Sequence, residues 1–164
     1  MPAVRPGDVA PNVVLQNVET TAAGARTPER FELYDRVGNQ YLILEFYPHG
    51  LEPRFHPHLQ ELEGAQQELQ RHGGQVAVVA AQPLDQLRAR VDEEGLTFPA
   101  AADPDRTAHQ AYGLAEPDGG AAPAPAMVVV GPDRVVRYAR GPVGGPLGAD
   151  ELVRLLDRLQ GREA

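Results

Sequence analysis

The sequence predicts one α/β domain, a layered sandwich in which helices cover a central sheet. Two apolar runs, residues 40–47 and 75–82, have the composition of strands that are buried on both faces. A segment with apolar residues at helical spacing follows each run, and a hairpin pattern with a final helix closes the chain. This alternation is typical of helices packed on a largely parallel sheet. The length of 164 residues fits a single domain, residues 1–164.

The first half of the chain predicts a short strand, a loop, a central strand and a long helix. The short strand covers residues 13–18, and the small and polar residues 19–30 after it predict a surface loop. Pro57 suits the start of the long helix, because its φ angle is fixed and it has no N–H to leave unpaired. Gly73 and Gly74 end that helix. The residues that recur at helical spacing within it are Leu59, Leu62, Gln66 and Leu69.

The second buried run is followed by a helix, a short strand and a short helix. Pro83 opens the first of these helices and Gly95 stops it. The strand lies near residues 99–102, and the short helix crosses residues 106–112. The inward face of the first helix is formed by Leu84, Leu87 and Val91.

A hairpin and a helix complete the chain. Residues 115–126 form a loop rich in Pro, Ala and Gly, and the apolar runs on both sides of residues 132–134 predict two hairpin strands. Asp150 is the predicted N-cap of the last helix. Its core stripe is formed by Leu152, Leu155, Leu156 and Leu159.

Composition excludes several classes of chemistry. The chain has no lysine, so it cannot form a Schiff base on a lysine amine. It has no cysteine, which excludes thiolate catalysis, disulfides and thiolate metal sites. The net charge is −8 and the arginines are scattered along the chain, so we expect no nucleic-acid binding.

The sequence also bears on location. No apolar run approaches the length of a membrane span, so we expect no membrane interaction. The first residues lack the basic and apolar blocks of a signal peptide, and we therefore expect a cytoplasmic protein. No residue pattern indicates a cofactor, and we expect none.

Four segments, in order, resemble those of the AhpC/TSA peroxiredoxins, the redoxin family of the thioredoxin-fold superfamily. They are VRPGDVAPNVVL (4–15), YLILEFYP (41–48), LTFPAAADPDRTAHQAYGL (96–114) and MVVVGPDRVVRY (127–138). The resemblance implies a thioredoxin-like, peroxiredoxin-type central mixed β-sheet flanked by α-helices. In such a sheet the strands at 41–47 and 76–80 are adjacent and parallel. The resemblance further implies a homodimer and an antioxidant oxidoreductase activity.

The chain departs from the family at the catalytic motif, Pro-x-x-x-Thr-x-x-Cys. In register, Pro48 is kept, Glu52 stands in the threonine position and Phe55 stands in the cysteine position. The family's arginine is also missing, since residues 107–133 contain none. Pro125, or its neighbour Pro123, matches the cis-proline place of thioredoxin-like relatives, and the sequence leaves its isomer open. Thiol peroxidase chemistry is impossible without the thiolate.

Two readings of Phe55 remain open at this level. The ring either fills the vacated pocket as a buried plug, which we favour because burial stabilises it, or it contacts a ligand. His49, His56 and His58 form the only chemically suggestive cluster and could bind Zn²⁺ or Cu²⁺ with Glu52 as a fourth ligand. If a helix begins at Pro57, the rings of His56 and His58 diverge, and no metal site forms. His72 and His109 are predicted to be surface residues.

We therefore expect a peroxiredoxin-like protein that lacks the catalytic cysteine and has no thiol peroxidase activity. We expect it to act as a non-peroxidase binding or interaction module, which binds an unknown protein or small molecule at the former active-site face. A histidine-based metal-binding protein is the alternative. An antioxidant oxidoreductase is the second alternative, implied by the resemblance and contradicted by the absence of thiols.

Overall fold

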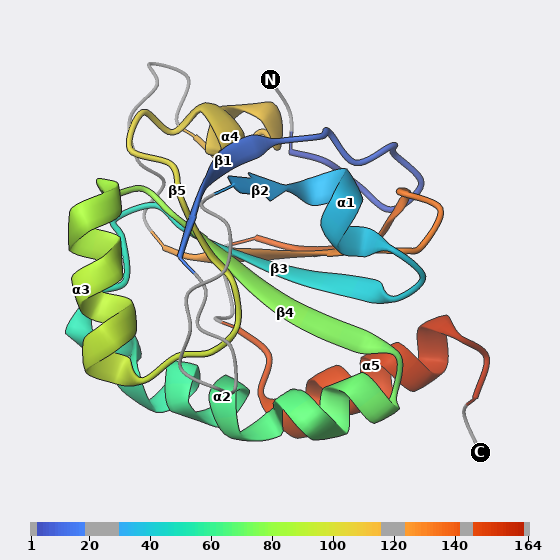
Figure 1. Ribbon diagram of the computed structural model, residues 1–164. Helices are drawn as coiled ribbons and strands as arrows, with labels where there is room; N and C mark the ends of the chain where they lie inside the picture. Colours follow the sequence, from blue (N-terminus) through green and yellow to red (C-terminus); the bar gives the residue numbers. More distant parts are fainter. Residues whose placement is uncertain (1–2, 19–29, 116–123, 142–145, 163–164) are drawn as a thin grey trace.

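The computed structural model describes residues 3–18, 30–115, 124–141 and 146–162. Within these residues one mixed sheet has the strand order β2-β1-β5-β4-β3-β6-β7, and helices lie on both of its faces (Figure 1). The strands are β1 (Val14–Val18), β2 (Arg30–Glu32), β3 (Tyr41–Tyr47), β4 (Gly74–Ala80), β5 (Ala100–Ala102), β6 (Ala126–Val130) and β7 (Val136–Arg140). The helices are α1 (Leu33–Val37), the 3-10 helix η1 (Pro53–Phe55), α2 (His56–Arg71), α3 (Leu84–Glu94), α4 (Thr107–Ala111) and α5 (Ala149–Leu159).

The pairing of the central strands confirms the predicted mixed sheet. β3 and β4 run parallel, with Tyr41 opposite Gly74 and Tyr47 opposite Ala80, and α2 connects them. β5 is parallel to β4, whereas β6 pairs with β3 in the antiparallel sense and forms a hairpin with β7. The carboxyl ends of β3 and β4 therefore lie side by side, next to the turn that precedes α2.

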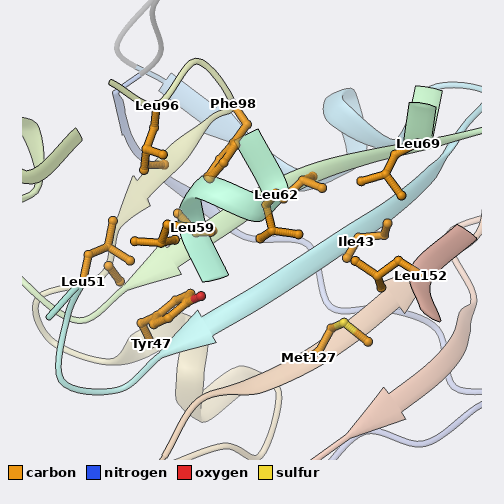
Figure 2. Packing of buried hydrophobic residues seen from close by; sticks show 14 of the residues in the cluster. Ile43, Tyr47, Leu51, Leu59, Leu62, Leu69, Leu96, Phe98, Met127 and Leu152 are labelled. Carbon is orange, nitrogen blue, oxygen red and sulfur yellow. The ribbon is translucent and has the colours of Figure 1, made fainter. Parts of the chain in front are cut away.

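The sheet is buried on both faces, as the continuous apolar runs predict. On one face α2, α3 and α5 cover Ile43 and Tyr47, and Leu59 and Leu62 of α2 pack into this layer (Figure 2). On the other face α1 and α4 cover the alternate residues of β3, including Phe46. Among the helices that the structure describes, none combines the length and apolarity that a membrane span needs.

The last helix begins differently from the prediction. Its N-cap is Gly148, and Asp150 lies inside the first turn. The N–H of Gly148 donates to the Glu151 carboxylate at 3.1 Å, and the N–H of Ala149 donates to Glu61 of α2 at 2.8 Å. Two glutamates thus satisfy two of the free N–H groups at this end, and Asp150 does not act as the cap.

The prediction that His109 is a surface residue is wrong. Its ring is 1% exposed, lies edge-on to Phe46 at 5.2 Å between centroids, and bonds through Nδ1 to the Asp103 carboxylate at 2.7 Å. Asp103 also accepts the N–H groups of Ala108 and His109. It caps α4 and holds the histidine inside, which the spacing of apolar residues could not indicate. His72 is half-buried and bonds to Asp157 at 2.8 Å.

Candidate functional site

The loop formed by residues 48–55 joins β3 to α2 at the carboxyl ends of two parallel strands. Sites in open α/β sheets commonly lie at such ends. Pro48 is buried, and its carbonyl accepts a hydrogen bond from Nε of Arg106 at 3.3 Å. Gly50 has a φ of +80°, and a Cβ there would lie 2.8 Å from Cδ of Gln82. The positive φ favours glycine at this position, and a Cβ would also displace the amide end of Gln82.

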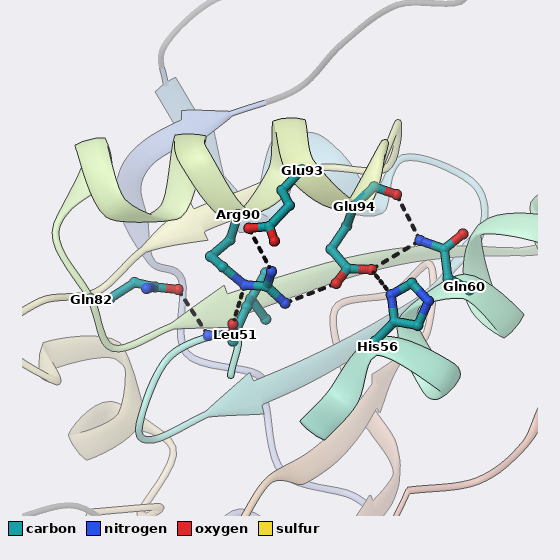
Figure 3. A network of polar contacts seen from close by, with 7 residues as sticks. All are labelled: Leu51, His56, Gln60, Gln82, Arg90, Glu93 and Glu94. Atoms are coloured by element: carbon teal, nitrogen blue, oxygen red, sulfur yellow. Dashed lines mark hydrogen bonds and ion pairs between the residues drawn. The ribbon is translucent and has the colours of Figure 1, made fainter. Parts of the chain in front are cut away.

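Leu51 fastens the loop to the body of the protein through its backbone and its side chain (Figure 3). Its N–H donates to Oε1 of Gln82 at 2.8 Å, and its carbonyl accepts from Nε of Arg90 at 2.7 Å. The leucine side chain is 1% exposed within the core layer under α2. The loop is therefore held at Leu51 by Gln82, which follows β4, and by Arg90 of α3.

Arg90 connects this loop to the start of α2 through Glu94 (Figure 3). The guanidinium donates to Glu94 at 2.9 Å, and the same carboxylate bonds to Nδ1 of His56 at 2.6 Å and to Nε2 of Gln60 at 3.0 Å. Burial disfavours the charged form of Glu94, but the hydrogen bonds from Gln60, His56 and Arg90 outweigh burial and lower the pKa of this carboxyl. The result is a closed polar network around one buried carboxylate.

A second buried cluster lies directly beneath the loop, on β3. Glu45 is 2% exposed; it accepts the hydroxyl of Tyr47 at 2.6 Å and bonds to Nε2 of His58 at 2.8 Å. Burial lowers the pKa of His58, but the hydrogen bond and charge of Glu45 outweigh burial and raise it. Burial and the adjacent Glu45 carboxylate raise the pKa of Tyr47. Glu45 is not among the predicted site residues, although a lone acid in the apolar run YLILEFY must find a partner when it is buried.

The three histidines of the predicted metal cluster do not converge. His56 and His58 bond to different carboxylates, Glu94 and Glu45, on different elements, and His49 is exposed. In the described part of the chain, no group of three or more His, Cys, Asp or Glu side chains is arranged to hold a metal ion.

Phe55 is half-buried, so it closes the vacated pocket less completely than the predicted plug. One side of its ring meets Tyr47 at 5.0 Å between centroids, in an edge-on arrangement. The guanidinium of Arg54 lies over the ring at 4.5 Å from the centroid and also pairs with Glu52 at 3.1 Å. Phe55 is the N-cap residue of α2. The outer side of its ring is therefore covered by Arg54 and not by core residues.

The loop is not without positive charge, although residues 107–133 contain no arginine. Arg54, Arg90 and Arg106 all contact it, and the last two come from other elements. Pro125 is half-buried and lines a small pocket together with Glu45. Its preceding peptide bond is trans, whereas Pro123 lies outside the described residues.

An open hollow of about 380 Å³ remains on the surface between the loop and α3. It is lined by His49, Leu51, Glu52, Pro53, Gln82, Gln86, Ala89 and Arg90. The hollow combines polar groups with aliphatic surface, and its floor is the backbone that Gln82 and Arg90 hold in place. This arrangement is suited to binding and offers no thiol or hydroxyl nucleophile.

Comparisons with known proteins agree with this geometry. The AhpC/TSA family model matches residues 6–139. A protein of Oryza sativa subsp. japonica named 1-Cys peroxiredoxin A is 27% identical over 173 residues, which cover 98% of this chain and 74% of the relative.

Solved structures share the same arrangement of strands and helices. Mycobacterium tuberculosis AhpC superposes with a TM-score of 0.78 at 21% identity, covering 99% of this chain and 96% of that one. Enterococcus faecalis AhpC gives a TM-score of 0.79 at 20% identity, covering 98% and 94%. These likenesses confirm the predicted thioredoxin-like, peroxiredoxin-type fold.

Proposed function

Because the chain belongs to the AhpC/TSA family and contains no cysteine, we propose that it is a non-peroxidase member whose former active-site face binds a partner. A thiol peroxidase begins its reaction by attack of a thiolate on the O–O bond, and no side chain here can form a thiolate. This absence is the observation that carries the proposal. The partner is a small molecule or a protein.

The residues at the family's threonine and cysteine positions, Glu52 and Phe55, both interact with Arg54. Arg54 lies over the ring of Phe55 and pairs with Glu52, so the positions of the threonine and the cysteine share one cation. Such a cluster stabilises the turn and leaves no group poised for attack. It supports the view that this turn has become part of a surface.

The rigidity of the loop supports a binding role. Leu51 is held through both backbone groups, and Arg90 extends the hold to Glu94 and His56. A surface that is already ordered loses little conformational entropy when a partner binds. The adjoining hollow of about 380 Å³ is within the size range of small-molecule sites.

The two alternative functions have less support. The imidazoles of His56 and His58 are each engaged by a separate buried carboxylate, so a shared metal would have to break both bonds. An antioxidant function through a thiol has no residue to perform it.

A peroxide-consumption assay tests the non-peroxidase proposal. We expect the purified chain to consume no hydrogen peroxide or organic hydroperoxide above the buffer blank, with dithiothreitol or thioredoxin as the reductant. A Phe55→Cys variant is measured in parallel, since it supplies a thiol in the family register and shows whether the thiol alone, without the family's threonine and arginine, gives any consumption. Turnover by the unmodified chain that persists after metal chelation would refute the proposal.

We also propose that the chain forms a homodimer. β2 and β7 are the edge strands of the described sheet, and an edge strand offers unpaired backbone groups to a second copy. Size-exclusion chromatography with light scattering should give twice the 17.7 kDa mass of one chain. A mass of one chain at about 50 µM, a concentration at which micromolar dimers persist, would count against the dimer.

A further inference from the structure

A second hollow, of about 280 Å³, lies between β7 and α5 and shares no lining residue with the hollow at the loop. We propose that it binds a small oxyanion, a phosphate or carboxylate group carried on a compact apolar body. The lining residues are Tyr138, Arg140, Leu147, Glu151, Arg154, Leu155 and Arg158. We refer to this hollow as the arginine hollow.

Positive charge is concentrated in the arginine hollow of a chain whose net charge is −8. Arg154 and Arg158 are both exposed and stand one helical turn apart on α5. Neither guanidinium has an ion-pair or hydrogen-bond partner among the residues that the structure describes. Like charges at this spacing destabilise a helix. Arg140 of β7 also lines the hollow, but it already has a partner of its own.

Two of the three acids of α5 have other partners, and the third, Asp150, makes no ion pair with Arg154 among the described residues although it stands one turn before it. Asp157 bonds to His72 at 2.8 Å and to Arg162 at 3.3 Å. Glu151 stands on the rim of the hollow, but its carboxylate accepts the N–H of Gly148 at the start of the helix. An anion from outside is therefore the group that would pair with Arg154 and Arg158.

The floor of the arginine hollow determines what else the ligand should carry. Leu147 and Leu155 are 8% and 3% exposed, and the Tyr138 side chain beside them is half-buried. Guanidinium groups match the planar, bidentate geometry of carboxylate and phosphate oxygens. Drug-sized ligands usually occupy pockets of roughly 300–1,000 Å³, so this smaller hollow suits one anionic head on a single ring or a short aliphatic group.

Titration with two simple probes tests this proposal. Phenyl phosphate and benzoate present the two head groups on the same ring, and benzyl alcohol is the neutral control. We expect saturable amide chemical-shift changes at β7 and α5 with at least one anion, and none with benzyl alcohol. The tighter of the two anions identifies the head group that the hollow prefers.

Variants distinguish binding in the arginine hollow from nonspecific attraction of an anion to positive charge. Arg154→Gln and Arg158→Gln should each weaken binding about tenfold, because each removes one charged hydrogen-bonding fork. Arg71→Gln changes the net charge equally at an exposed position outside the hollow, and it should leave the affinity unchanged. Circular dichroism verifies that each single variant is folded. Absence of saturation up to about 20 mM, a concentration far above that of a millimolar site, would overturn the proposal. Equal weakening in Arg71→Gln, or equal binding of benzyl alcohol, would overturn it as well.

Discussion

At the scale of single residues, Phe55 shows how an aromatic ring packs at the start of α2. Its ring has Tyr47 on one side and the Arg54 guanidinium on the other, and it is half-buried. Removing an aromatic ring from a closed core usually lowers the free energy of unfolding by about 3–5 kcal/mol. Because Phe55 is partly exposed, its ring buries less apolar area, and removing the ring should lower the free energy of unfolding by less.

We expect Phe55→Ala to lower the free energy of unfolding by about 1–3 kcal/mol, measured by urea denaturation. Phe98→Ala is the matched control, because Phe98 is 1% exposed in the same core layer and should lose about 3–5 kcal/mol. Equal losses in the two variants would mean that Phe55 is as deeply buried as Phe98. A loss below about 0.5 kcal/mol would instead place the ring at the free surface.

At the scale of elements, α3 holds the loop to the sheet through one side chain. Arg90 donates to the Leu51 carbonyl and to Glu94, and its side chain is 14% exposed. Removing the guanidinium would leave Glu94 as a buried carboxylate with less compensation. Arg90 also pairs with Glu93, whose side chain is 71% exposed, so this second pair should contribute little.

Arg90→Leu should therefore cost about 2–4 kcal/mol of stability and speed amide hydrogen exchange at residues 50–55. Glu93→Gln is the control, and we expect it to change stability by less than about 0.5 kcal/mol with no effect on exchange in the loop. If Arg90→Leu were no more harmful than Glu93→Gln, the loop would be held by Gln82 and apolar packing alone.

At the scale of the whole molecule, stability should depend on pH in two opposite ways. The pKa of His58 is raised in the folded chain, so its contribution is complete below about pH 6.5, the ordinary value, and is lost as the pH rises through the raised pKa. Burial disfavours the charged form of Asp103, but hydrogen bonds from His109 and Ala108 outweigh burial and lower its pKa. Its contribution is present above about pH 4 and is lost as the pH falls through the lowered pKa.

Urea unfolding between about pH 3 and pH 9 should therefore give a maximum of stability within this range. His58→Gln should reduce the slope on the alkaline side. Asp103→Asn should reduce the slope on the acid side without abolishing it, because the pKa of Glu94 is also lowered in the folded chain. Each variant should leave the slope on the other side unchanged. His49→Gln, which changes an exposed histidine, should retain the profile of the unmodified chain. An unchanged alkaline slope in His58→Gln would show that another group causes it.

Much of the fold could be predicted because its signals are local. The apolar runs that became β3 and β4, the proline before α3 and the glycine after it all lie within a few residues of the feature that they indicate. The burial of polar side chains was harder to predict. His109 has the position of a surface residue in a short helix, and only Asp103 and the sheet beneath it explain its burial.

The sequence by itself determined the order of strands and helices from β3 onward and the impossibility of thiol chemistry, but it did not indicate β2 and α1. Periodicity and composition are properties of the chain before it folds, and a missing cysteine cannot be replaced by folding. Only the tertiary structure decided that His56 pairs with Glu94, 38 residues away, and that Arg90 holds Leu51, 39 residues away. Such contacts depend on how packed helices meet the sheet. Each polar group that packing buries must take whichever partner lies within hydrogen-bonding distance.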